Sequence, residues 1–417
     1  MKILWLCNNA PGVVRSAVSG KPAGEVNWLD HVLSDLREQG IALRILYRGG
    51  GQPGQLDDNC SYAPVGETPA HIYRPELAEA FRKELEEYRP DVIHSWGVEY
   101  QHALAMVNAA KQTGMLDRTV ASIQGLCCRI APHYIDGLPP KALRYRTFRD
   151  FLRHDSIARQ QQIYTRRGQL EIRTLETLGH VIGRTRWDRE NALAINPKLT
   201  YHFCNETLRT PFYEGQWQFP ACTKHRIFAS SCVYPVKGFH LLLQAMPSIL
   251  KRFPDASLAV CGRSFLESGA RCNGYEKYLA GLARSYHLEN RIAFLGSLSA
   301  GQMKQAYLDA NVFVLPSTME NSPNALGEAM LLGVPCVAAE VGGVSSLLSP
   351  EEGILCPPVS PAGLADGICR VFAMEDGGAA LGYKARAHAR KTHDPQTNLQ
   401  TLTEIYRQLS GLGGEAR

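Results

Sequence analysis

The sequence lacks several features that would each point to a particular class of protein. No apolar run approaches the roughly 18 residues that a membrane-spanning helix needs, so we do not expect an integral membrane protein. The 12 cysteines are scattered and form no C-x-x-C pair, which favours buried, reduced thiols over zinc ligands or disulfides. Lys and Arg number 45 against 40 Asp and Glu, so the chain is less basic than most nucleic-acid-binding domains. Together these absences lead us to expect a cytoplasmic protein with no nucleic-acid partner.

The length and composition are those of a globular chain with more than one domain. Its 417 residues are 45% hydrophobic and 20% charged, and roughly 150 residues per domain gives two or three domains. Strand-like apolar runs alternate with amphipathic segments along the chain, which predicts parallel sheets with helices on both faces. The Pro- and Gly-containing stretch 205–221 marks the expected break. We therefore predict an α/β protein with two doubly wound, Rossmann-like domains that face each other, at residues 1–208 and 209–394.

The alternation is specific enough to name individual elements. The expected strands are 2–7, 42–47, 92–94, 120–123 and 180–182 in the first domain, and 226–229, 257–261, 292–294, 312–315 and 336–338 in the second. The expected helices are 26–39, 239–253, 275–286, 300–310, 326–332 and 395–412.

The stretch 316–330 carries the most chemical information. It follows the expected strand 312–315 and opens a helix, with Ser322 as the N-cap and Pro323 as the first helical residue. The backbone N–H groups of Asn324 and Ala325 would then form an anion site at the helix start.

Two glutamates flank this helix start. Glu320 precedes the helix and Glu328 lies inside it, eight residues or about 12 Å along a helix axis. That spacing does not suit the ~5 Å carboxylate pair of a retaining glycoside hydrolase. Each carboxylate could instead bind the hydroxyls of a separate sugar ring. The alternative is a capped helix with two surface glutamates.

Three shorter patterns follow other strands of the second domain. Lys237-Gly238 comes between a strand and a helix, where a lysine can reach a phosphate, although an ordinary exposed lysine would give the same pattern. Phe294-Leu295-Gly296 ends a strand, where the backbone could approach a flat base. The glycine pair in 341–344 would allow a tight turn or a close approach to a phosphate.

Together these patterns resemble the retaining glycosyltransferases of the GT-B fold, glycosyltransferase family 4. The resemblance is strongest over about 225–375, and its most specific motif is the pair of glutamates separated by seven residues, with Ser-Pro-Asn between them. It implies that Glu320 binds the hydroxyls of a donor sugar, that Glu328 binds the ribose of a nucleoside diphosphate sugar, and that Lys237 meets the diphosphate. Leu295 would face the base, and the final segment 395–417 would return to the first domain as a helix. The predicted donor site is completed by Ser231, Gly238, Arg263, Asn321, Ser322, Pro323, Asn324 and Ala325.

The chain departs from the family pattern at several positions. The family's arginine before the lysine is replaced by Ser231 or Cys232, and Arg263 is the candidate for the missing charge. A histidine that usually contacts the donor sugar is replaced by Gln124, whose amide can hydrogen-bond but cannot act as an acid or base.

The first domain supplies the expected acceptor side. Residues 22–25 resemble the first glycine loop of the family. Gly24 is present there, but Ala23 stands where the family has its second glycine. With Gln124, Gly24 and Trp96 are the predicted contacts of the acceptor or donor sugar from this domain. His94 could join them, but both His94 and Trp96 could equally be packed at a strand end.

A basic segment, 141–173, contains nine basic and three acidic residues. Tyr145, Phe148 and Leu152 fall among them at helical spacing, which is typical of a basic amphipathic helix at an anionic membrane or a lipid pyrophosphate. A solvated helix face is the alternative. On the first interpretation the protein would be peripheral on the inner face of the plasma membrane.

The function that we expect is retaining transfer of a sugar from a UDP- or GDP-sugar to a hydroxyl of a glycan or glycolipid, in cell-surface polysaccharide biosynthesis. No cofactor is expected, and no metal, since no Asp-x-Asp ends an expected strand. A sugar-nucleotide epimerase or phosphorylase of the same fold, and a non-catalytic sugar-nucleotide-binding subunit, are the alternatives.

Overall fold

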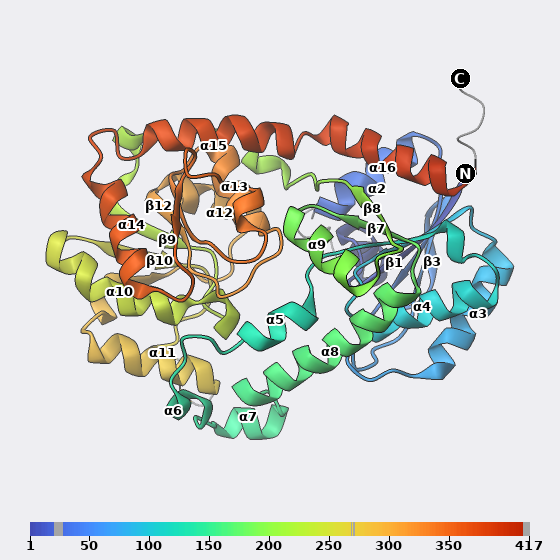
Figure 1. Cartoon of the computed structure of the whole chain (residues 1–417), viewed down its shortest axis with the longest axis horizontal. Coiled ribbons are helices and arrows are strands. Elements are labelled where there is room, and N and C mark those ends of the chain that lie inside the picture. Colours follow the sequence, from blue (N-terminus) through green and yellow to red (C-terminus); the bar gives the residue numbers. More distant parts are fainter. Residues whose placement is uncertain (21–27, 268, 270–271, 412–417) are drawn as a thin grey trace. The chain divides into compact units, whose positions relative to one another are not determined.

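The computed structural model describes residues 1–20, 28–267, 269 and 272–411, and its chain forms two compact α/β units (Figure 1). The first unit contains Met1–Cys128, Tyr164–Thr207 and His393–Arg417, and the second contains Arg129–Ile163 and Leu208–Thr392. The main part of the second unit begins where the sequence placed the domain break. The structure differs from the prediction at residues 129–163, which we assigned to the first domain but which contact the second unit.

The first unit is built on an eight-stranded sheet with the order β3-β4-β2-β1-β5-β6-β7-β8. All neighbouring strands are parallel except β3 and β4, which are antiparallel. In β1, five of the six side chains are buried, as expected for a parallel strand covered on both faces. The strands are β1 (Lys2–Cys7), β2 (Ala42–Tyr47), β3 (Gly54–Asp57), β4 (Cys60–Pro64), β5 (Val92–Trp96), β6 (Thr119–Ser122), β7 (His180–Gly183) and β8 (Thr200–Phe203).

The helices of this unit follow the strands along the chain. They are α1 (Gly12–Ser19), α2 (Trp28–Glu38), α3 (Pro75–Tyr88), α4 (Gln101–Gln112), α9 (Arg186–Ile195) and α16 (Pro395–Leu409). Two of the four unit boundaries fall inside α5 (Cys127–His133) and α8 (Ile157–Thr177), and the other two follow Thr207 and Thr392.

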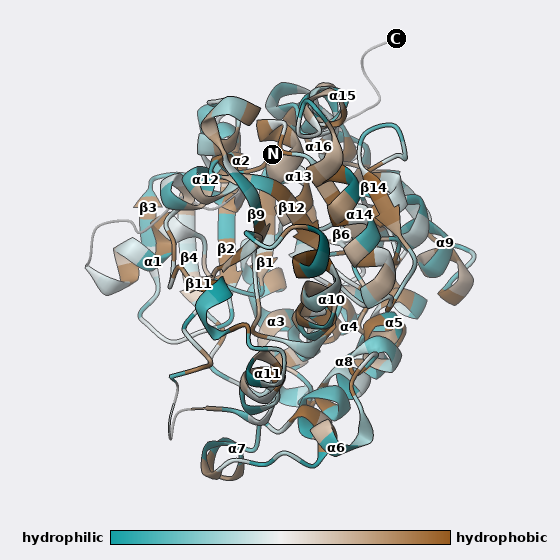
Figure 2. Cartoon of the chain, turned by 90° about the vertical axis from the view of Figure 1, so that its left-hand side faces the viewer, coloured by the Kyte–Doolittle hydropathy of each residue, from teal (hydrophilic) through white to brown (hydrophobic). Residues whose placement is uncertain are grey.

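The second unit has a six-stranded, fully parallel sheet with the order β11-β10-β9-β12-β13-β14. Its strands are β9 (Thr223–Ala229), β10 (Ser257–Val260), β11 (Ile292–Phe294), β12 (Ala310–Leu315), β13 (Cys336–Ala339) and β14 (Ile354–Cys356). Its helices are α6 (Pro140–Leu143), α7 (Phe148–Arg153), α10 (Phe239–Arg252), α11 (Gly274–Ser285), α12 (Ala300–Leu308), α13 (Asn324–Leu332), α14 (Pro361–Ala373) and α15 (Ala379–Thr392). All six residues of β12 are buried, and Figure 2 shows the hydrophobic colour along this strand and α13.

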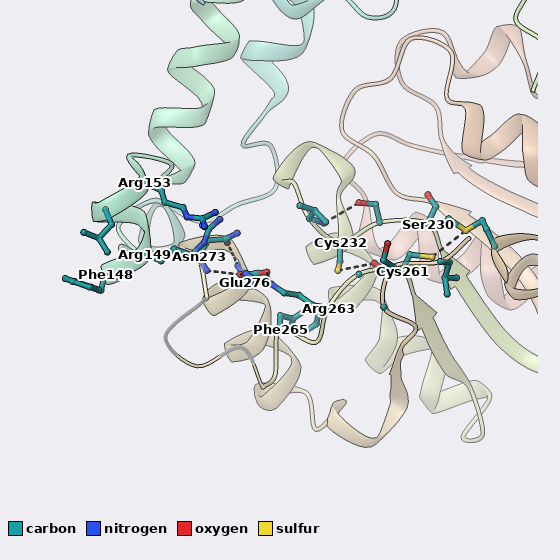
Figure 3. A pocket seen from close by; sticks show the side chains of 18 residues that line it. Phe148, Arg149, Arg153, Ser230, Cys232, Cys261, Arg263, Phe265, Asn273 and Glu276 are labelled. Atoms are coloured by element: carbon teal, nitrogen blue, oxygen red, sulfur yellow. Dashed lines mark hydrogen bonds and ion pairs between the residues drawn. The ribbon is translucent and has the colours of Figure 1, made fainter. Parts of the chain in front are cut away.

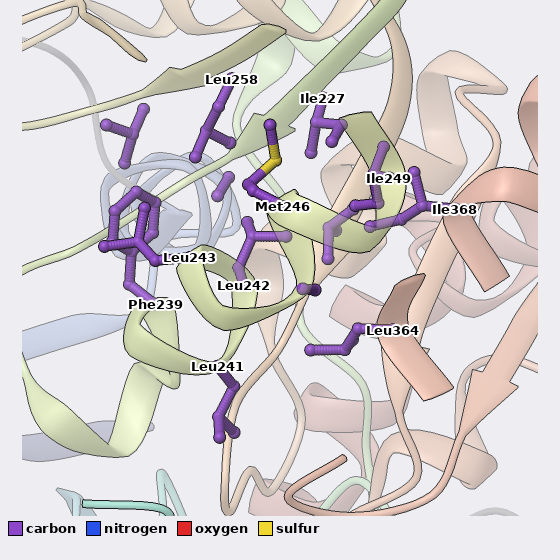
Figure 4. Packing of buried hydrophobic residues seen from close by; sticks show 14 of the residues in the cluster. Ile227, Phe239, Leu241, Leu242, Leu243, Met246, Ile249, Leu258, Leu364 and Ile368 are labelled. Atoms are coloured by element: carbon purple, nitrogen blue, oxygen red, sulfur yellow. The ribbon is translucent and has the colours of Figure 1, made fainter. Parts of the chain in front are cut away.

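Helix α10 shows how the hydrophobic spacing of the sequence becomes a core. Its buried residues Phe239, Leu242 and Met246 recur every three or four positions and so share one face of the helix. Figure 4 shows this face against Ile227 of β9 and Leu258 of β10, in a cluster that α14 also joins. The cluster fixes the position of β9, whose carboxyl end carries part of the site described below.

The predicted fold class is confirmed, since both units are Rossmann-like α/β domains. Strands β1, β2 and β11 have the predicted bounds, and the other predicted strands and helices that the structure describes in full are shifted at their ends by up to three residues. The prediction missed β3, β4, β8 and β14 because these strands are short and lie at or near the sheet edges. In particular, β4 reads Cys-Ser-Tyr-Ala-Pro, which has no β-branched residue.

The basic segment 141–173 is not one amphipathic helix, as we predicted, but lies in α6, α7 and the first part of α8. Tyr145 lies between α6 and α7 and packs against Tyr278 of α11, with the ring centroids 6.4 Å apart. A helix through Tyr145 would lose this contact with the core of the second unit. Among the described residues, no helix is both long and apolar enough to cross a membrane.

Candidate functional site

The strand order of the second unit identifies where a ligand site is expected. The chain runs outward from β9 to β10 and β11, and then returns to β12 on the other side of β9. The connection therefore reverses direction between β9 and β12. In open α/β sheets, ligands bind beyond the carboxyl ends of the strands at such a reversal. The two loops concerned are 230–238, after β9, and 316–323, after β12.

These two loops are held tightly against each other. The backbone N–H of Thr318 donates to the carbonyl of Val236 at 2.8 Å. Gly238 has a φ of 66°, and a Cβ at this position would collide with the carbonyl oxygen of Pro316. Only glycine fits this conformation and this contact. Gly238, which we predicted as a donor-binding residue, thus also serves to join the loops.

The contact between the loops brings together two residues of the predicted site. Lys237 Nζ donates to Glu320 Oε1 at 2.7 Å, and Ser317 Oγ donates to the same oxygen, also at 2.7 Å. The Glu320 side chain is 10% exposed and the Lys237 side chain 36% exposed. The lysine therefore keeps a solvent-facing part beside a fixed carboxylate, which suits contact with an anion and a hydroxyl.

The glycine pair after β13 supports Glu320 from its backbone side. The N–H of Gly343 donates to the Glu320 carbonyl at 3.0 Å. Gly342 has a φ of 54°, and a Cβ there would collide with the same carbonyl oxygen. The glycine pair thus forms a tight turn against the loop after β12, one of the two roles that the sequence left open.

Helix α13 begins one residue later than the capping pattern predicted, and two residues before the expected helix 326–332. Its first residue is Asn324, and Pro323 is its N-cap without a side-chain hydrogen bond. The prediction that Ser322 caps the helix and that Pro323 opens it is therefore wrong. The extended backbone of Pro323, with a ψ of 110°, shifts the start by one position.

Glu328 lies in the second turn of α13 and is held by a residue that sequence analysis did not identify. Arg209 donates to Glu328 Oε1 from Nε at 2.8 Å and approaches it with Nη2 at 2.7 Å. Tyr307 Oη lies 3.5 Å from Oε2 of the same carboxylate. The Arg209 guanidinium also lies over the ring of Phe212, 4.8 Å from its centroid. Glu328 therefore has a fixed orientation.

Arg209 could not be found from sequence because its partner lies 119 positions away. It occupies the stretch 205–221, which the sequence marked only as a domain break. No local pattern distinguishes it from the other arginines of the chain.

A cavity of about 880 Å³ lies at the carboxyl ends of β9, β10 and β11 (Figure 3). Two glycines, Gly262 and Gly296, form reciprocal backbone hydrogen bonds of 2.8 and 3.2 Å in its wall. Both have positive φ, and neither would place a Cβ within 3.4 Å of another residue, so this wall is open backbone. A flat ring could approach it closely. The lining residues are Phe148, Arg149, Leu152, Arg153, Ser230, Ser231, Cys232, Val233, Cys261, Gly262, Arg263, Phe265, Asn273, Glu276, Gly296, Ser297, Leu298 and Met303.

Two of the predicted donor residues, Ser231 and Arg263, line this cavity. Arg263 donates to both oxygens of Glu276, from Nε at 2.8 Å and from Nη2 at 2.6 Å, so its charge is paired (Figure 3). Leu295 is not among the lining residues; it packs against the core of the unit, and Gly296–Leu298 form the wall instead.

The cavity and the Arg209–Glu328 pair are electrostatically connected. Burial raises the pKa of the Cys261 thiol to about 11; Glu328 raises this pKa further and Arg209 lowers it. Cys261 lines the cavity. Arg209 and Glu328 therefore affect this thiol in opposite directions.

In the first unit, Trp96 and His94 are packed at the end of β5. Trp96 is 7% exposed, and its ring lies 5.2 Å from that of Trp5 and 4.0 Å from that of His94. His94 is fully buried, with Nδ1 2.6 Å from Tyr406 Oη of α16 and Nε2 2.8 Å from Ser122 Oγ. Burial lowers the pKa of His94 to about 3, so the ring is neutral. Of the two alternatives for His94 and Trp96, the structure shows packing at a strand end.

Of the other two predicted residues of the first unit, Gln124 is described by the structure and Gly24 is not. Gln124 is half-buried and donates to Glu206 Oε1 at 2.8 Å, while Arg184 donates to the other oxygen of that carboxylate at 2.6 Å. Gly24 and the rest of the loop 22–25 lie outside the described residues. In the part of the chain that the structure describes, no group of three or more His, Cys, Asp or Glu side chains could hold a metal ion.

The second unit contains a segment that matches a known protein family. Residues 219–388 match the family model described as Glycosyl transferases group 1. One curated relative, a D-inositol 3-phosphate glycosyltransferase of Corynebacterium urealyticum, is 28% identical over 179 residues, 42% of this chain and 41% of the relative. An uncharacterized glycosyltransferase of Methanocaldococcus jannaschii is 32% identical over 137 residues, 33% of each chain. The match thus spans about two-fifths or less of these relatives.

Solved structures match over nearly the whole chain. Sucrose-phosphate synthase from Thermosynechococcus elongatus has a TM-score of 0.71 and 19% identity, covering 99% of this chain and 100% of that one. HepE from Anabaena in complex with UDP and glucose has a TM-score of 0.67 and 17% identity, covering 97% and 98%. At such identities the similarity establishes the fold. The chain therefore has the fold of the GT-B glycosyltransferases, and its second unit matches the glycosyl transferases of group 1.

Proposed function

We propose that this chain is a retaining glycosyltransferase of family 4 that moves a sugar from a nucleoside diphosphate sugar to a hydroxyl of a glycan or glycolipid, in cell-surface polysaccharide biosynthesis. The observation that carries the proposal is the pairing of Lys237 with Glu320 at the reversal between β9 and β12. These two residues lie 83 positions apart, and the fold places them where open α/β sheets bind ligands. They also lie within the segment that matches the family model.

The site supports a division of roles between the two glutamates. Glu320, whose Oε1 is held by Lys237 and Ser317, would accept hydrogen bonds from hydroxyls of the donor sugar. Glu328, oriented by Arg209, would accept hydrogen bonds from the ribose. The open backbone at Gly262 and Gly296 would receive the base.

The reaction needs stabilisation of the leaving diphosphate. The bond between the sugar carbon and the diphosphate breaks, the acceptor oxygen bonds to that carbon on the same face, and the leaving diphosphate takes the acceptor proton. Lys237 and the start of α13 at Asn324 would stabilise the developing negative charge. The chain's own cations are proposed to do this without a metal ion.

The relatives and structural neighbours support the substrate class. The Anabaena HepE structures contain UDP, UDP with glucose, or UDP-glucose, and a TarM structure of Staphylococcus aureus contains UDP and a GlcNAc-glycerol. We therefore propose a UDP-sugar as the first donor to test, and a cytoplasmic enzyme that acts at the inner face of the plasma membrane.

A binding and turnover experiment tests this function. UDP and UDP-sugars should raise the melting temperature of the protein, with a shift that grows with the logarithm of the ligand concentration above Kd. Incubation with the binding donor and lipid-linked or glycan acceptors should give a product with the donor's anomeric configuration, in EDTA as well as without it. Sugar epimerised with no acceptor present, binding with no transfer to any acceptor, or an inverted product would reject the proposal.

A further inference from the structure

Helix α7 exposes large hydrophobic side chains that would normally be buried. Phe148 is 73% exposed, Phe151 72% and Leu152 61%. They lie within five consecutive residues of a six-residue helix. Burial of each would favour the folded state, so their joint exposure needs a reason.

This cluster differs from the other exposed hydrophobic residues of the described chain. Those are single residues or a neighbouring pair, and they are Ile72, Phe203, Val233, Tyr234, Tyr286 and Tyr383. Scattered exposure of this kind is normal for a folded protein. A contiguous apolar group, by contrast, marks an interaction surface.

Cations flank the apolar group along the chain. Lys141, Arg144, Arg146 and Arg153 are exposed, and Asp150 is the only acidic residue between positions 141 and 154. Asp150 is 3% exposed, and its Oδ2 accepts hydrogen bonds from the backbone N–H of Gly274 at 2.8 Å and of Thr147 at 3.1 Å. Residues 141–154 therefore present positive charge and apolar side chains with no exposed carboxylate, and Asp155, which follows, is 20% exposed and paired with Arg149 at 2.9 Å.

The helix is firmly attached to the second unit. Thr147 and Asp150 form a capping box at its start, and the bond from Asp150 to Gly274 ties it to the first turn of α11. A Cβ at Gly274 would collide with the carbonyl oxygen of Tyr145, so the two segments are in close contact. The exposed rings are thus held by a fixed support.

The rest of the basic segment, 155–173, exposes no large hydrophobic side chain. Arg167 of α8 is 14% exposed, lies 4.3 Å from the ring centroid of Tyr100 and 4.9 Å from that of Tyr164, and is paired with Glu99 at 3.4 Å. Its charge is used inside the first unit. Arg166 and Arg173 are exposed, but no large hydrophobic side chain between 155 and 173 is. Within the basic segment, exposed cations and exposed apolar side chains therefore occur together only in 141–154, which we call the α7 surface.

We propose that the α7 surface docks on an anionic lipid bilayer. The apolar side chains of α7 enter the interfacial layer, and the flanking cations contact the lipid phosphates, the arrangement typical of interfacial helices. The charge complementarity favours an anionic leaflet over a protein partner. Phe148, Leu152 and Arg153 also line the 880 Å³ cavity (Figure 3). Docking therefore places the cavity next to the headgroup layer, where a lipid-linked acceptor lies; this last step rests on the proposed function.

Cosedimentation of the full chain with vesicles tests the docking. Wild-type protein should bind phosphatidylglycerol vesicles at low salt and not pure phosphatidylcholine vesicles. Phe148→Ser/Phe151→Ser should abolish most binding. Arg144→Ser/Arg146→Ser should lower the partition coefficient roughly thirtyfold at low salt, about fivefold for each cation, and less at high salt.

Matched controls distinguish loss of the α7 surface from the loss of any exposed aromatic or basic side chain. Tyr383→Ser, at a side chain that is 72% exposed, and Arg186→Ser, at one that is 85% exposed, should bind like the wild type. Melting temperatures should be unchanged in all variants because the substituted side chains are exposed. A Phe151→Trp variant should show a blue-shifted emission increment with anionic vesicles if the helix inserts.

The outcomes distinguish this inference from the proposed function. The docking is overturned if the wild type does not bind anionic vesicles. It is also overturned if Phe148→Ser/Phe151→Ser and Arg144→Ser/Arg146→Ser bind them as tightly as the wild type does. Self-association of the wild type that Phe148→Ser/Phe151→Ser abolishes, without vesicle binding, would assign the surface to a second copy instead. UDP titration of Arg144→Ser/Arg146→Ser tests the donor site alone: intact UDP binding with lost vesicle binding supports both ideas, and absent UDP binding in the wild type counts only against the proposed function.

Discussion

In the second unit, charged side chains at the carboxyl end of the sheet are paired but partly exposed, whereas in the first unit His94 of β5 and His102 of α4 are buried and hydrogen-bonded. The Lys237 and Arg263 side chains are 36% and 47% exposed, and each contacts one glutamate. His94 and His102 of the first unit are 0% and 1% exposed. An ion pair with an open side can exchange its partner for a ligand, while a buried hydrogen bond cannot be given up without a large cost.

From this difference we infer different roles for the two sets of side chains. The networks of the first unit attach its parts to one another: His94 links β5 to Tyr406 of α16, more than 300 positions later. The pairs of the second unit instead hold side chains ready at the reversal between β9 and β12. The comparison predicts that substitutions in the second unit change ligand binding and turnover, and that those in the first unit change stability.

The largest expected effect is on turnover when Lys237 is replaced. Lys237→Ala should lower kcat on the order of 10²-fold or more, because one preorganised positive charge is lost at the leaving diphosphate. Initial rates with a saturating UDP-sugar measure this effect. Lys251→Ala, an exposed lysine at the end of α10, is the matched control and should be neutral. A kcat within threefold of wild type for Lys237→Ala would remove the lysine from the catalytic step.

Glu320→Ala should lower turnover of the intact sugar donor roughly tenfold to a hundredfold while leaving UDP affinity nearly unchanged. The expected loss reflects a charged hydrogen bond to the sugar. The pairing with Lys237 adds a second expectation: the effects of Glu320→Ala and Lys237→Ala on kcat should not add, because residues in contact couple. Additive effects in the double variant would show that the pair acts as two independent groups.

Glu328→Ala should weaken UDP binding by about 1–3 kcal/mol, the range for a lost charged hydrogen bond to the ribose. Arg209→Ala should weaken it about tenfold by releasing the Glu328 carboxylate, with partial rescue by Arg209→Lys. Calorimetric titration of the single and double variants checks this. If Arg209 acts through Glu328, its substitution should have little further effect in a Glu328→Ala background, whereas an undiminished effect would give Arg209 its own ligand contact.

In the first unit, the matching prediction concerns the pH dependence of stability. The pKa of His94 is lowered to about 3 by burial, against roughly 6.5 in an unfolded chain, so its contribution is complete above pH 6.5 and is lost as the pH falls toward 3. Between these values, His94→Gln should reduce the slope of unfolding free energy against pH by up to about 1.4 kcal/mol per pH unit. UDP affinity at neutral pH should stay the same.

Denaturant unfolding of wild type and variant at several pH values measures the slope, with His287→Asn, an exposed histidine, as the control. An unchanged slope in His94→Gln would mean that His94 does not carry the acid sensitivity of this unit. A large loss of UDP affinity would contradict the division between the two units.

The sequence could predict those features of the fold and of the site that depend on short, local patterns. The buried strand runs are local and led to the fold class, which is confirmed. The spacing of Glu320 and Glu328 is also local and led to the site region, which stays a prediction. Three features needed the structure. Arg209 binds Glu328, which lies 119 positions away in the sequence. Tyr145 is not helical and packs against Tyr278 of α11. Helix α13 begins at Asn324 because the backbone of Pro323 is extended. Each depends on tertiary contacts or backbone geometry that no sequence window contains.

The smallest expected effect concerns Arg263, the candidate for the missing arginine of the family pattern. Its guanidinium already binds both oxygens of Glu276, and the side chain is 47% exposed, so its net charge at the cavity is reduced by pairing and by solvent. Arg263→Ala should therefore weaken UDP binding less than fivefold, well below the effect of Glu328→Ala. Glu276→Gln sharpens the test, because it releases the arginine while keeping much of the cap at the start of α11. If pairing is what limits Arg263, this variant should bind UDP more tightly than wild type, and the gain should vanish in Arg263→Ala/Glu276→Gln. A hundredfold loss of UDP affinity in Arg263→Ala would instead show that the arginine leaves Glu276 for the diphosphate, and would make it the principal charge of the donor site.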